Sequence, residues 1–486
     1  LFNTTGSADL RIRASNGTTW TNFAEEGYDL RFLELKCGEN IIQTEFVKES
    51  ETCESETCYV LARDYSCAST GSEISKVLTP GKHTLKFEFG NETAYAHNLA
   101  CGNIGLCGDL DVANCVYNLT SDVSSSGICF HVTANNATLN CNNFLISYAD
   151  GYGINATGVN QTTIKNCRIA ELGPVGSANH GIFFSSAFNS SILNGSIFTE
   201  GIASRGIHLA SSSNISISNI NITTQGSNSN GIHLASSSRV NIDNVNITTK
   251  GIGGVSRGIF FASTFNSSLY RVFIDSSGSG GDGIIFSPSS DQNVVNETTI
   301  IAEQHGINLA TSGSNKENVF SRLNITAGSY PIYVQDSGNT FSLQDSILYS
   351  ISLDEVSISV SVTSGEWNFT NVTKLGGGLI DITWTPTASG ILNVHWHLNA
   401  YANYSNGIDA DGVNISARDR NNILRFSQLT GANGRIPRQS VLEYKRSGMG
   451  GSSFVYYSNY TFNASHPFTG ENLMQSRNMS TNRFLV

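Results

Sequence analysis

The chain has 486 residues, of which 14% are charged, with 47 Gly, 7 Pro and a net charge of −11. This length allows two or three domains with a sizeable core, and the acidic balance argues against the broad basic surface that nucleic acid requires. No apolar run approaches the roughly 18 residues that would cross a bilayer, so we expect no membrane span. We also expect no cofactor and no metal site.

Residues 1–100 alternate polar and apolar positions in short runs such as ADLRIRA, with turn signals between the runs. This pattern predicts an N-terminal β-sandwich. All ten cysteines lie before residue 168, and none forms a C-x-x-C pair, which favours disulfides in an oxidising compartment over a zinc site. Spacing leaves the pairing open among Cys37, Cys53, Cys58, Cys67, Cys101, Cys107, Cys115, Cys129, Cys141 and Cys167.

Residues 101–350 contain a repeat, most obvious in GIHLASSSNISISNINITT from Gly206 and GIHLASSSRVNIDNVNITT from Gly231. Each repeat begins with a residue pair whose second member is Ile, and apolar residues alternate after it, which predicts a strand with one buried face. Units this short bury a core only by stacking. The repeats start at Gly127, Gly153, Gly181, Gly206, Gly231, Gly258, Gly283, Gly306 and Pro331.

The runs CFHVTANNATLNCNNFLI, from Cys129, and GINATGVNQTTIKNCRI, from Gly153, resemble the right-handed parallel β-helix family. They are similar in particular to archaeal-type surface proteins with NosD-like or pectate-lyase-like repeats. The resemblance implies an all-β fold in which a right-handed parallel β-helix is flanked by N-terminal and C-terminal β-sandwich domains.

Asparagines recur thirteen residues after several repeat starts. Amides at equivalent positions of stacked coils can hydrogen-bond to one another, so we expect an inward, buried ladder. Two of its members are also glycosylation acceptors, and we expect both to be unmodified. The ladder comprises Asn166, Asn194, Asn219, Asn244 and Asn296.

A second column lies two residues after the repeat starts and should face outward, yet it is rich in rings. Three interpretations remain open: packing beneath a long turn, contact with another subunit, and a platform on which sugar rings lie. Two imidazoles without a carboxylate or thiol make a poor metal site. The column contains Phe183, His208, His233, Phe260, Ile285 and Tyr333.

Acidic side chains within the repeats never share a position in adjacent coils. Cleavage of polysaccharides requires neighbouring carboxylates or a calcium site. We therefore expect that the protein is not an enzyme, with no catalytic residues to name.

Residues 351–391 are expected to form linking strands, and 392–486 a C-terminal β-sandwich. The stretch DGVNISARDRNNILRFSQLTGANGRIPRQSVLEY, from Asp411, resembles the transthyretin-like or carboxypeptidase-regulatory-like sandwich. That resemblance implies a fold and carries no activity.

Asn-x-Ser/Thr acceptors are spread over the whole length, which favours an extracellular, N-glycosylated surface protein. We expect glycans at Asn3, Asn16, Asn91, Asn118, Asn136, Asn155, Asn160, Asn189, Asn214, Asn221, Asn246, Asn266, Asn324, Asn368, Asn371, Asn403, Asn414, Asn459, Asn463 and Asn478.

The two ends differ in charge. Residues 1–100 hold nine Lys/Arg against fifteen Asp/Glu, and residues 392–486 hold nine against five. This asymmetry suits head-to-tail association of copies of the chain. The leading hypothesis is a structural protein that self-assembles into a surface fibre, pilus-like filament or coat. The alternatives are a glycan-binding adhesin and a polysaccharide lyase or hydrolase.

Overall fold

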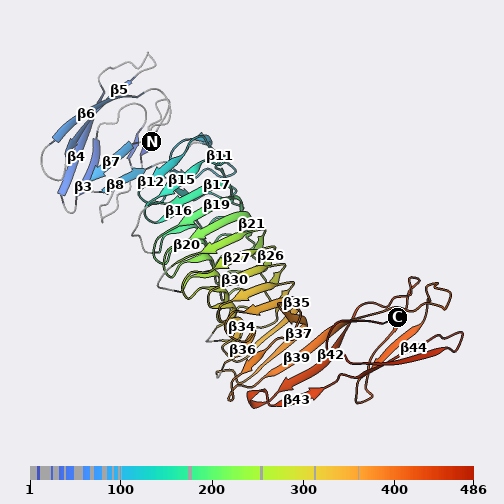
Figure 1. Cartoon of the computed structure of the whole chain (residues 1–486). Coiled ribbons are helices and arrows are strands. Elements are labelled where there is room, and N and C mark those ends of the chain that lie inside the picture. The colour runs from blue at the N-terminus through green and yellow to red at the C-terminus, as the bar shows by residue number, and fades with distance from the viewer. Residues whose placement is uncertain are drawn as a thin grey trace.

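The computed structural model describes the backbone of eight strands between residues 8 and 96, then Leu99 and residues 101–172, 178–251, 255–310, 313–359 and 361–485 (Figure 1). The acceptors Asn3, Asn16 and Asn91 and the side chains of the first four cysteines lie outside the described residues. The eight strands pair antiparallel as β1–β2, β3–β4–β5–β6 and β7–β8. They are β1 (Ala8–Leu10), β2 (Phe23–Glu25), β3 (Phe32–Cys37), β4 (Asn40–Lys48), β5 (Cys58–Tyr65), β6 (Gly71–Leu78), β7 (Leu85–Phe89) and β8 (Glu92–Ala96).

A 12-stranded parallel sheet forms one wall of a right-handed parallel β-helix, as the sequence predicted. Each coil contributes one strand, and successive strands lie side by side along the rod (Figure 1). The strands are β10 (Gly108–Leu110), β13 (Phe130–Val132), β16 (Tyr152–Thr157), β18 (His180–Ser185), β20 (Arg205–Ala210), β22 (Asn230–Ala235), β25 (Arg257–Ala262), β28 (Asp282–Phe286), β31 (His305–Leu309), β34 (Tyr330–Val334), β36 (Val356–Ile358) and β38 (Ile382–Trp384).

The other walls are also parallel, and several long strands run from one wall into the next. Their residues alternate between the core and solvent, as in β21, where Ile217, Ile220 and Ile222 are buried. The strands are β9 (Gly102–Ile104), β11 (Val116–Leu119), β12 (Val123–Ser125), β14 (Thr138–Asn140), β15 (Leu145–Tyr148), β17 (Thr163–Glu171), β19 (Ser191–Thr199), β21 (Ser216–Thr224), β23 (Asn241–Asp243), β24 (Asn246–Thr249), β26 (Ser268–Tyr270), β27 (Phe273–Ser276), β29 (Val294–Asn296), β30 (Thr299–Ala302), β32 (Asn318–Ser321), β33 (Asn324–Ala327), β35 (Asn339–Ser350) and β37 (Gly365–Lys374).

The repeated isoleucines form one continuous inward column. Ile207 pairs with Ile232, which pairs with Ile259, and all three are 0% exposed. The predicted start of the first coil is wrong, however, because Phe130 rather than Ile128 pairs with Ile154. Ile128 is 42% exposed, so the buried aromatic ring occupies the position that isoleucine fills in later coils.

The glycine before each isoleucine is required by close packing between coils. A Cβ atom on Gly206 would lie 2.3 Å from Cγ2 of Ile222 and 2.6 Å from the carbonyl oxygen of Gly231. Gly231 meets Ile247 and Gly258 in the same way. Neither neighbour leaves room for a side chain, so the position excludes even alanine.

The coils continue beyond residue 350, into the segment expected to hold linking strands. β36 pairs with β34 and β38 with β36, both parallel and in the same sheet. β37 likewise pairs with β35 along nine residues. The sequence repeat is no longer recognisable here, but the coils still stack in the same way.

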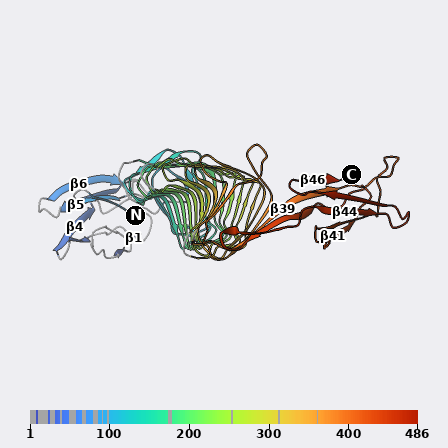
Figure 2. The same ribbon diagram turned by 60° about the horizontal axis from the view of Figure 1, so that its bottom comes forward.

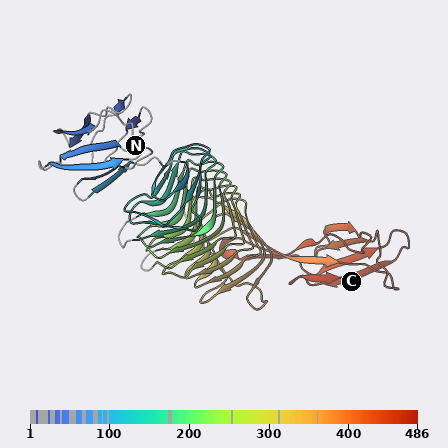
Figure 3. The ribbon, with the colours of Figure 1, turned by 90° about the horizontal axis from the view of Figure 1, so that it is seen from above.

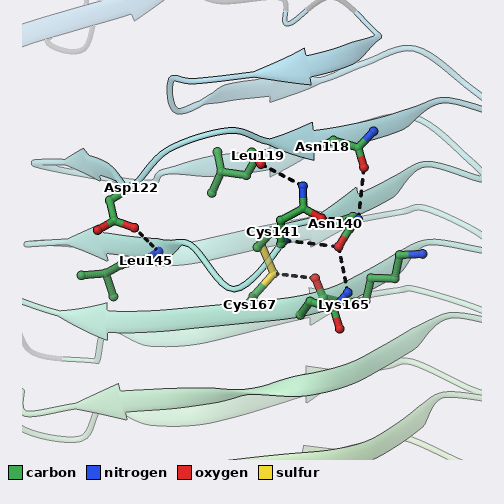
Figure 4. The surroundings of a disulfide bond; sticks show 10 residues. Asn118, Leu119, Asp122, Asn140, Cys141, Leu145, Lys165 and Cys167 are labelled. Atoms are coloured by element: carbon green, nitrogen blue, oxygen red, sulfur yellow. Dashed lines mark hydrogen bonds between the residues drawn. A yellow bond between two sulfur atoms is a disulfide. The ribbon is translucent and has the colours of Figure 1, made fainter.

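Three disulfides join the first coils: Cys101–Cys115, Cys107–Cys129 and Cys141–Cys167. Figure 4 shows the third, beside hydrogen bonds that also link adjacent coils. There, Asn140 donates to Asn118 at 3.1 Å. Covalent and polar links therefore fasten the N-terminal end of the stack.

The C-terminal strands extend away from the stack (Figures 2 and 3), and β39 runs from the coils into them. One group, with β39 paired to β42 and β46, packs on the antiparallel sheet β41–β40–β44–β45 around a second core that includes Trp396, Ile415 and Phe462. No helix in the described part of the chain has the length and hydropathy to cross a bilayer. The elements are β39 (Ile391–Ala400), β40 (Asn414–Arg418), β41 (Leu424–Leu429), β42 (Gln439–Ser447), the 3-10 turn η1 (Met449–Gly451), β43 (Ser453–Tyr456), β44 (Tyr460–Ser465), β45 (Asn472–Arg477) and β46 (Arg483–Leu485).

Candidate functional site

The outer face of the 12-stranded sheet carries two adjacent columns of side chains, which we call the strip. The predicted ring column is one of them, and its members occupy equivalent positions in neighbouring strands. The second column lies directly before the coil glycines. The first contains Asn155, Phe183, His208, His233, Phe260, Ile285, Asn308 and Tyr333, and the second Tyr152, His180, Arg205, Asn230, Arg257, Asp282, His305 and Tyr330.

Sequence reasoning missed the second column because its residue types do not repeat. Arg205 pairs with Asn230 and Ile207 pairs with Ile232, whereas Gly206 is skipped in the register. The residue before the glycine and the residue two after it therefore both face outward. The signal that could have revealed this column was position rather than residue type. Its members stand directly before the coil starts, although they include aromatic, cationic, amide and acidic side chains.

Rings stack without interruption over five coils of the strip. The centroid of Tyr152 lies 5.1 Å from that of Phe183, which lies 5.0 Å from His208. The rings of His208 and His233 are almost parallel, with 3° between their planes and 4.8 Å between centroids. Phe260 follows at 4.8 Å from His233. The strand spacing thus sets the spacing of a column of rings that are stacked on one another.

Arg205 lies beside this stack without a carboxylate in contact among the described residues. Its Nη1 atom donates to Nε2 of His180 at 3.2 Å and to Nδ1 of His208 at 3.0 Å. Burial, assisted by Arg205, lowers the pKa of His180 to about 4, of His208 to about 2 and of His233 to about 3. The imidazoles are therefore neutral at pH 7 and do not compete with the guanidinium for an anion.

A second guanidinium lies two coils away. Arg257 is separated from Arg205 by Asn230 in the strand register and lies 4.8 Å over the ring of Phe260. Several buried polar atoms in this stretch lack a hydrogen-bond partner. They are Nε of Arg205, Nε of Arg257, Oδ1 of Asn230 and both ring nitrogens of His233.

An acidic group adjoins the cationic stretch. Asp282, 3% exposed, accepts hydrogen bonds from Nδ1 of His305 at 2.8 Å and from Nδ2 of Asn308 at 3.0 Å. The ring of His305 lies 4.4 Å from that of Tyr333. The carboxylate fixes the orientation of the imidazole and leaves Nε2 as the nitrogen available to exchange a proton.

The asparagine ladder forms, but on the outer surface. Asn219 donates to Asn194 at 3.1 Å and receives a hydrogen bond from Asn244 at 2.7 Å. All three are exposed, which corrects the prediction of buried amides. Each has a positive φ at a turn between walls, and this backbone conformation directs the side chain outward. Asn166 continues the ladder, whereas Asn296 is half-buried and accepts from the Ser321 hydroxyl.

The other acceptor asparagines that the structure describes are exposed or half-buried, so each presents surface to solvent. Asn189, Asn214 and Asn266 lie at equivalent turns, where the amide of Asn214 donates to Asn189 at 2.6 Å. No group of three or more His, Cys, Asp or Glu side chains in the described ranges is arranged to hold a metal ion.

The C-terminal domain contains a separate hollow of about 430 Å³. Apolar side chains such as Ile415, Phe462 and Leu485 line it, and the Tyr404 hydroxyl lies 2.9 Å from Nε2 of His466 at its rim. It lacks the repeated rings and cations of the strip, which remains the stronger candidate site.

No protein-family model and no curated protein matches the chain. Solved structures match its fold. DFA-IIIase from Arthrobacter chlorophenolicus A6 is 10% identical over 54% of this chain and 80% of that chain, with a TM-score of 0.37. Polygalacturonase from Erwinia carotovora is 13% identical, covering 59% and 99%, with a TM-score of 0.33. The tailspike of E. coli bacteriophage HK620, in complex with a hexasaccharide, is 7% identical, covering 70% and 81%, with a TM-score of 0.32.

These matches correct two expectations, namely a structural filament subunit and a protein without enzymatic activity. Solved proteins with this fold include named enzymes and a tailspike bound to a hexasaccharide. At such low identities and TM-scores, the likeness assigns no activity to this chain. What this chain binds is determined by its own side chains.

Proposed function

We propose that the protein binds an extended glycan along the strip. The observation that carries this proposal is the unbroken stack from Tyr152 to Phe260, in which every ring except the buried His233 is partly open to solvent. Apolar C–H groups of a sugar pack against such a row of rings, and neighbouring polar groups bind its hydroxyls. A row repeated at about 4.8 Å per coil suits a chain ligand better than a compact one.

We further propose that the protein is an extracellular glycoprotein of the archaeal-type surface group that its repeats resemble. Three disulfides and surface-exposed acceptor asparagines support an oxidising, extracellular location. The transthyretin-like identity of residues 392–486 is part of the same proposal.

A glycan array followed by calorimetric titration tests the binding function. Replacing both Phe183 and Phe260 by Ser removes two rings of the stack and should weaken binding at least about tenfold. Phe265→Ser is the matched control, since this phenylalanine is 45% exposed and lies outside the strip. Equal affinity of the double variant and the control would overturn the proposal.

Cleavage of the bound glycan is a second candidate, favoured by the Asp282–His305 pair. An imidazole oriented by a carboxylate is a general base, and its Nε2 can accept a proton from substrate or water. Incubation with array-identified glycans and chromatography of the products tests this function. His305→Gln should abolish product formation while glycan binding persists, and a fully active variant would exclude the pair as the base.

A further inference from the structure

We propose that the segment of the strip between Arg205 and Arg257 binds an anionic substituent, the carboxylate or sulfate of an acidic glycan. This inference rests on the proposed glycan-binding function and specifies its ligand class. It concerns three consecutive strands, β20, β22 and β25, with Asn230 in the middle.

Among the described residues, the two guanidiniums outnumber the single carboxylate beside them, that of Asp282. The polar partners of Arg205 are two neutral imidazoles, and Arg257 faces the ring of Phe260. Asp282, in register with Arg257 on the next coil, attracts that guanidinium, while its carboxylate oxygens accept hydrogen bonds from His305 and Asn308. Guanidinium groups remain cationic at neutral pH, so this stretch holds two positive charges.

Buried polar atoms without hydrogen-bond partners lie between the two arginines. His233 is 9% exposed and Asn230 is 3% exposed, yet both ring nitrogens of His233 and Oδ1 of Asn230 form no hydrogen bond. An orphaned buried polar atom is costly and requires an explanation. A bound ligand with acceptor oxygens and hydroxyl donors would satisfy these atoms.

The chemistry of the orphaned atoms defines that ligand. Nε of each guanidinium is a donor and needs an acceptor oxygen, which a carboxylate or sulfate supplies. Oδ1 of Asn230 is an acceptor and needs a donor, which a sugar hydroxyl supplies. An acidic sugar carries both groups, whereas a free inorganic anion carries only the first.

The two cations also define a spacing. Arg205 and Arg257 are two strands apart, which places them about 10 Å from each other along the rod. Phe183, His208, His233 and Phe260 lie alongside in the neighbouring column. Sugar residues of one extended chain could therefore pack along the ring column while two of its acidic groups reach the guanidiniums.

The test compares binding of the full chain to a galacturonate hexamer, to its uncharged methyl ester, to a sulfated hexasaccharide and to inorganic sulfate. Wild-type protein should bind an acidic oligomer about tenfold or more tightly than the methyl ester. Preference for the galacturonate identifies a carboxylate as the ligand group, and preference for the sulfated oligomer identifies a sulfate. Inorganic sulfate alone should bind much more weakly than either.

Arg205→Gln and Arg257→Gln should each remove most of the acidic preference, so that the ratio of the affinities for the acidic and the esterified oligomer falls toward one. Arg205→Lys keeps the charge and should retain part of the acidic preference. It also serves as the test variant if Arg205→Gln does not fold. Arg271→Gln is the matched control, because this arginine pairs with Asp243 in another wall and its side chain is 54% exposed.

The outcomes separate the two proposals. Equal binding of acidic and esterified oligomers by wild-type protein overturns the anion site and leaves glycan binding intact. Acidic preference that survives both glutamine variants also overturns the site. Failure of every oligosaccharide to bind overturns both proposals.

Discussion

The strip and the asparagine ladder are both outward surfaces of the same coils, yet they differ in environment. On the ladder, Asn194, Asn219 and Asn244 are exposed, and their side chains bond to neighbouring asparagines of the ladder. On the strip, His233 and Asn230 are almost fully buried and keep unsatisfied atoms. Inward residues fix the coil beneath both surfaces, whereas the outward residues of the two surfaces differ in how far they are enclosed.

Both surfaces depend on the isoleucine column, and its disruption should have the largest effect. Ile232→Ala should lower the free energy of unfolding by about 2–5 kcal/mol, because the side chain is 0% exposed and its loss leaves a cavity. Chemical denaturation followed by circular dichroism measures the change. Ile301→Ala, at a position 39% exposed, should cost only about 0.5 kcal/mol. Similar losses at both sites would refute a single dry core.

Acid should destabilise the strip but not the ladder. The folded pKa values of His180, His208 and His233, about 4, 2 and 3, lie below the ordinary value of 6.5. Below pH 6.5 the unfolded chain therefore binds protons that the folded chain does not, and the free energy of unfolding falls as pH decreases toward those values.

Replacing both His208 and His233 by Phe keeps rings in the stack and removes two of these groups. Between pH 7 and pH 4.5 the wild-type protein should lose on the order of 1 kcal/mol per histidine more than this double variant. Asn219→Ala should show the wild-type pH dependence. Identical pH profiles for wild type and the histidine variant would contradict the assigned pKa shifts.

Breaking the ladder should have the smallest effect. Asn219→Gly removes the hydrogen bonds to Asn194 and Asn244 while tolerating the positive φ of 55°, so we expect a loss of about 1 kcal/mol. Asn219→Ala should cost more, because alanine adds backbone strain. If the glycine variant were as stable as wild type, the exposed amides would contribute nothing measurable to stability.

The sequence predicted the β-helix because inward positions repeat in residue type. Ile207, Ile232 and Ile259 face the same apolar environment and are therefore identical. The start of the first coil was predicted wrongly, because Phe130 replaces isoleucine there. Stacking beyond residue 350 also went unpredicted, because β36 and β38 keep the geometry without the motif.

The candidate site was only half predicted. The ring column was visible because Phe183, His208 and Phe260 are unusual at an outward position. Arg205 and Asp282 were not recognised, since a column whose members differ in charge shows no periodicity in residue type. The ladder was placed on the wrong side because the pattern of asparagines gives their spacing but not the left-handed backbone that turns them outward.

The glycine column gives the rod a modular length. Because Gly206, Gly231 and Gly258 let each coil rest directly on the next, one whole coil can be gained or lost in evolution without reshaping its neighbours. Every such event would shift the guanidiniums by a single step of about 4.8 Å. Duplication or deletion of a coil is thus a route by which the protein could adapt to a polymer whose charges are spaced at a different interval.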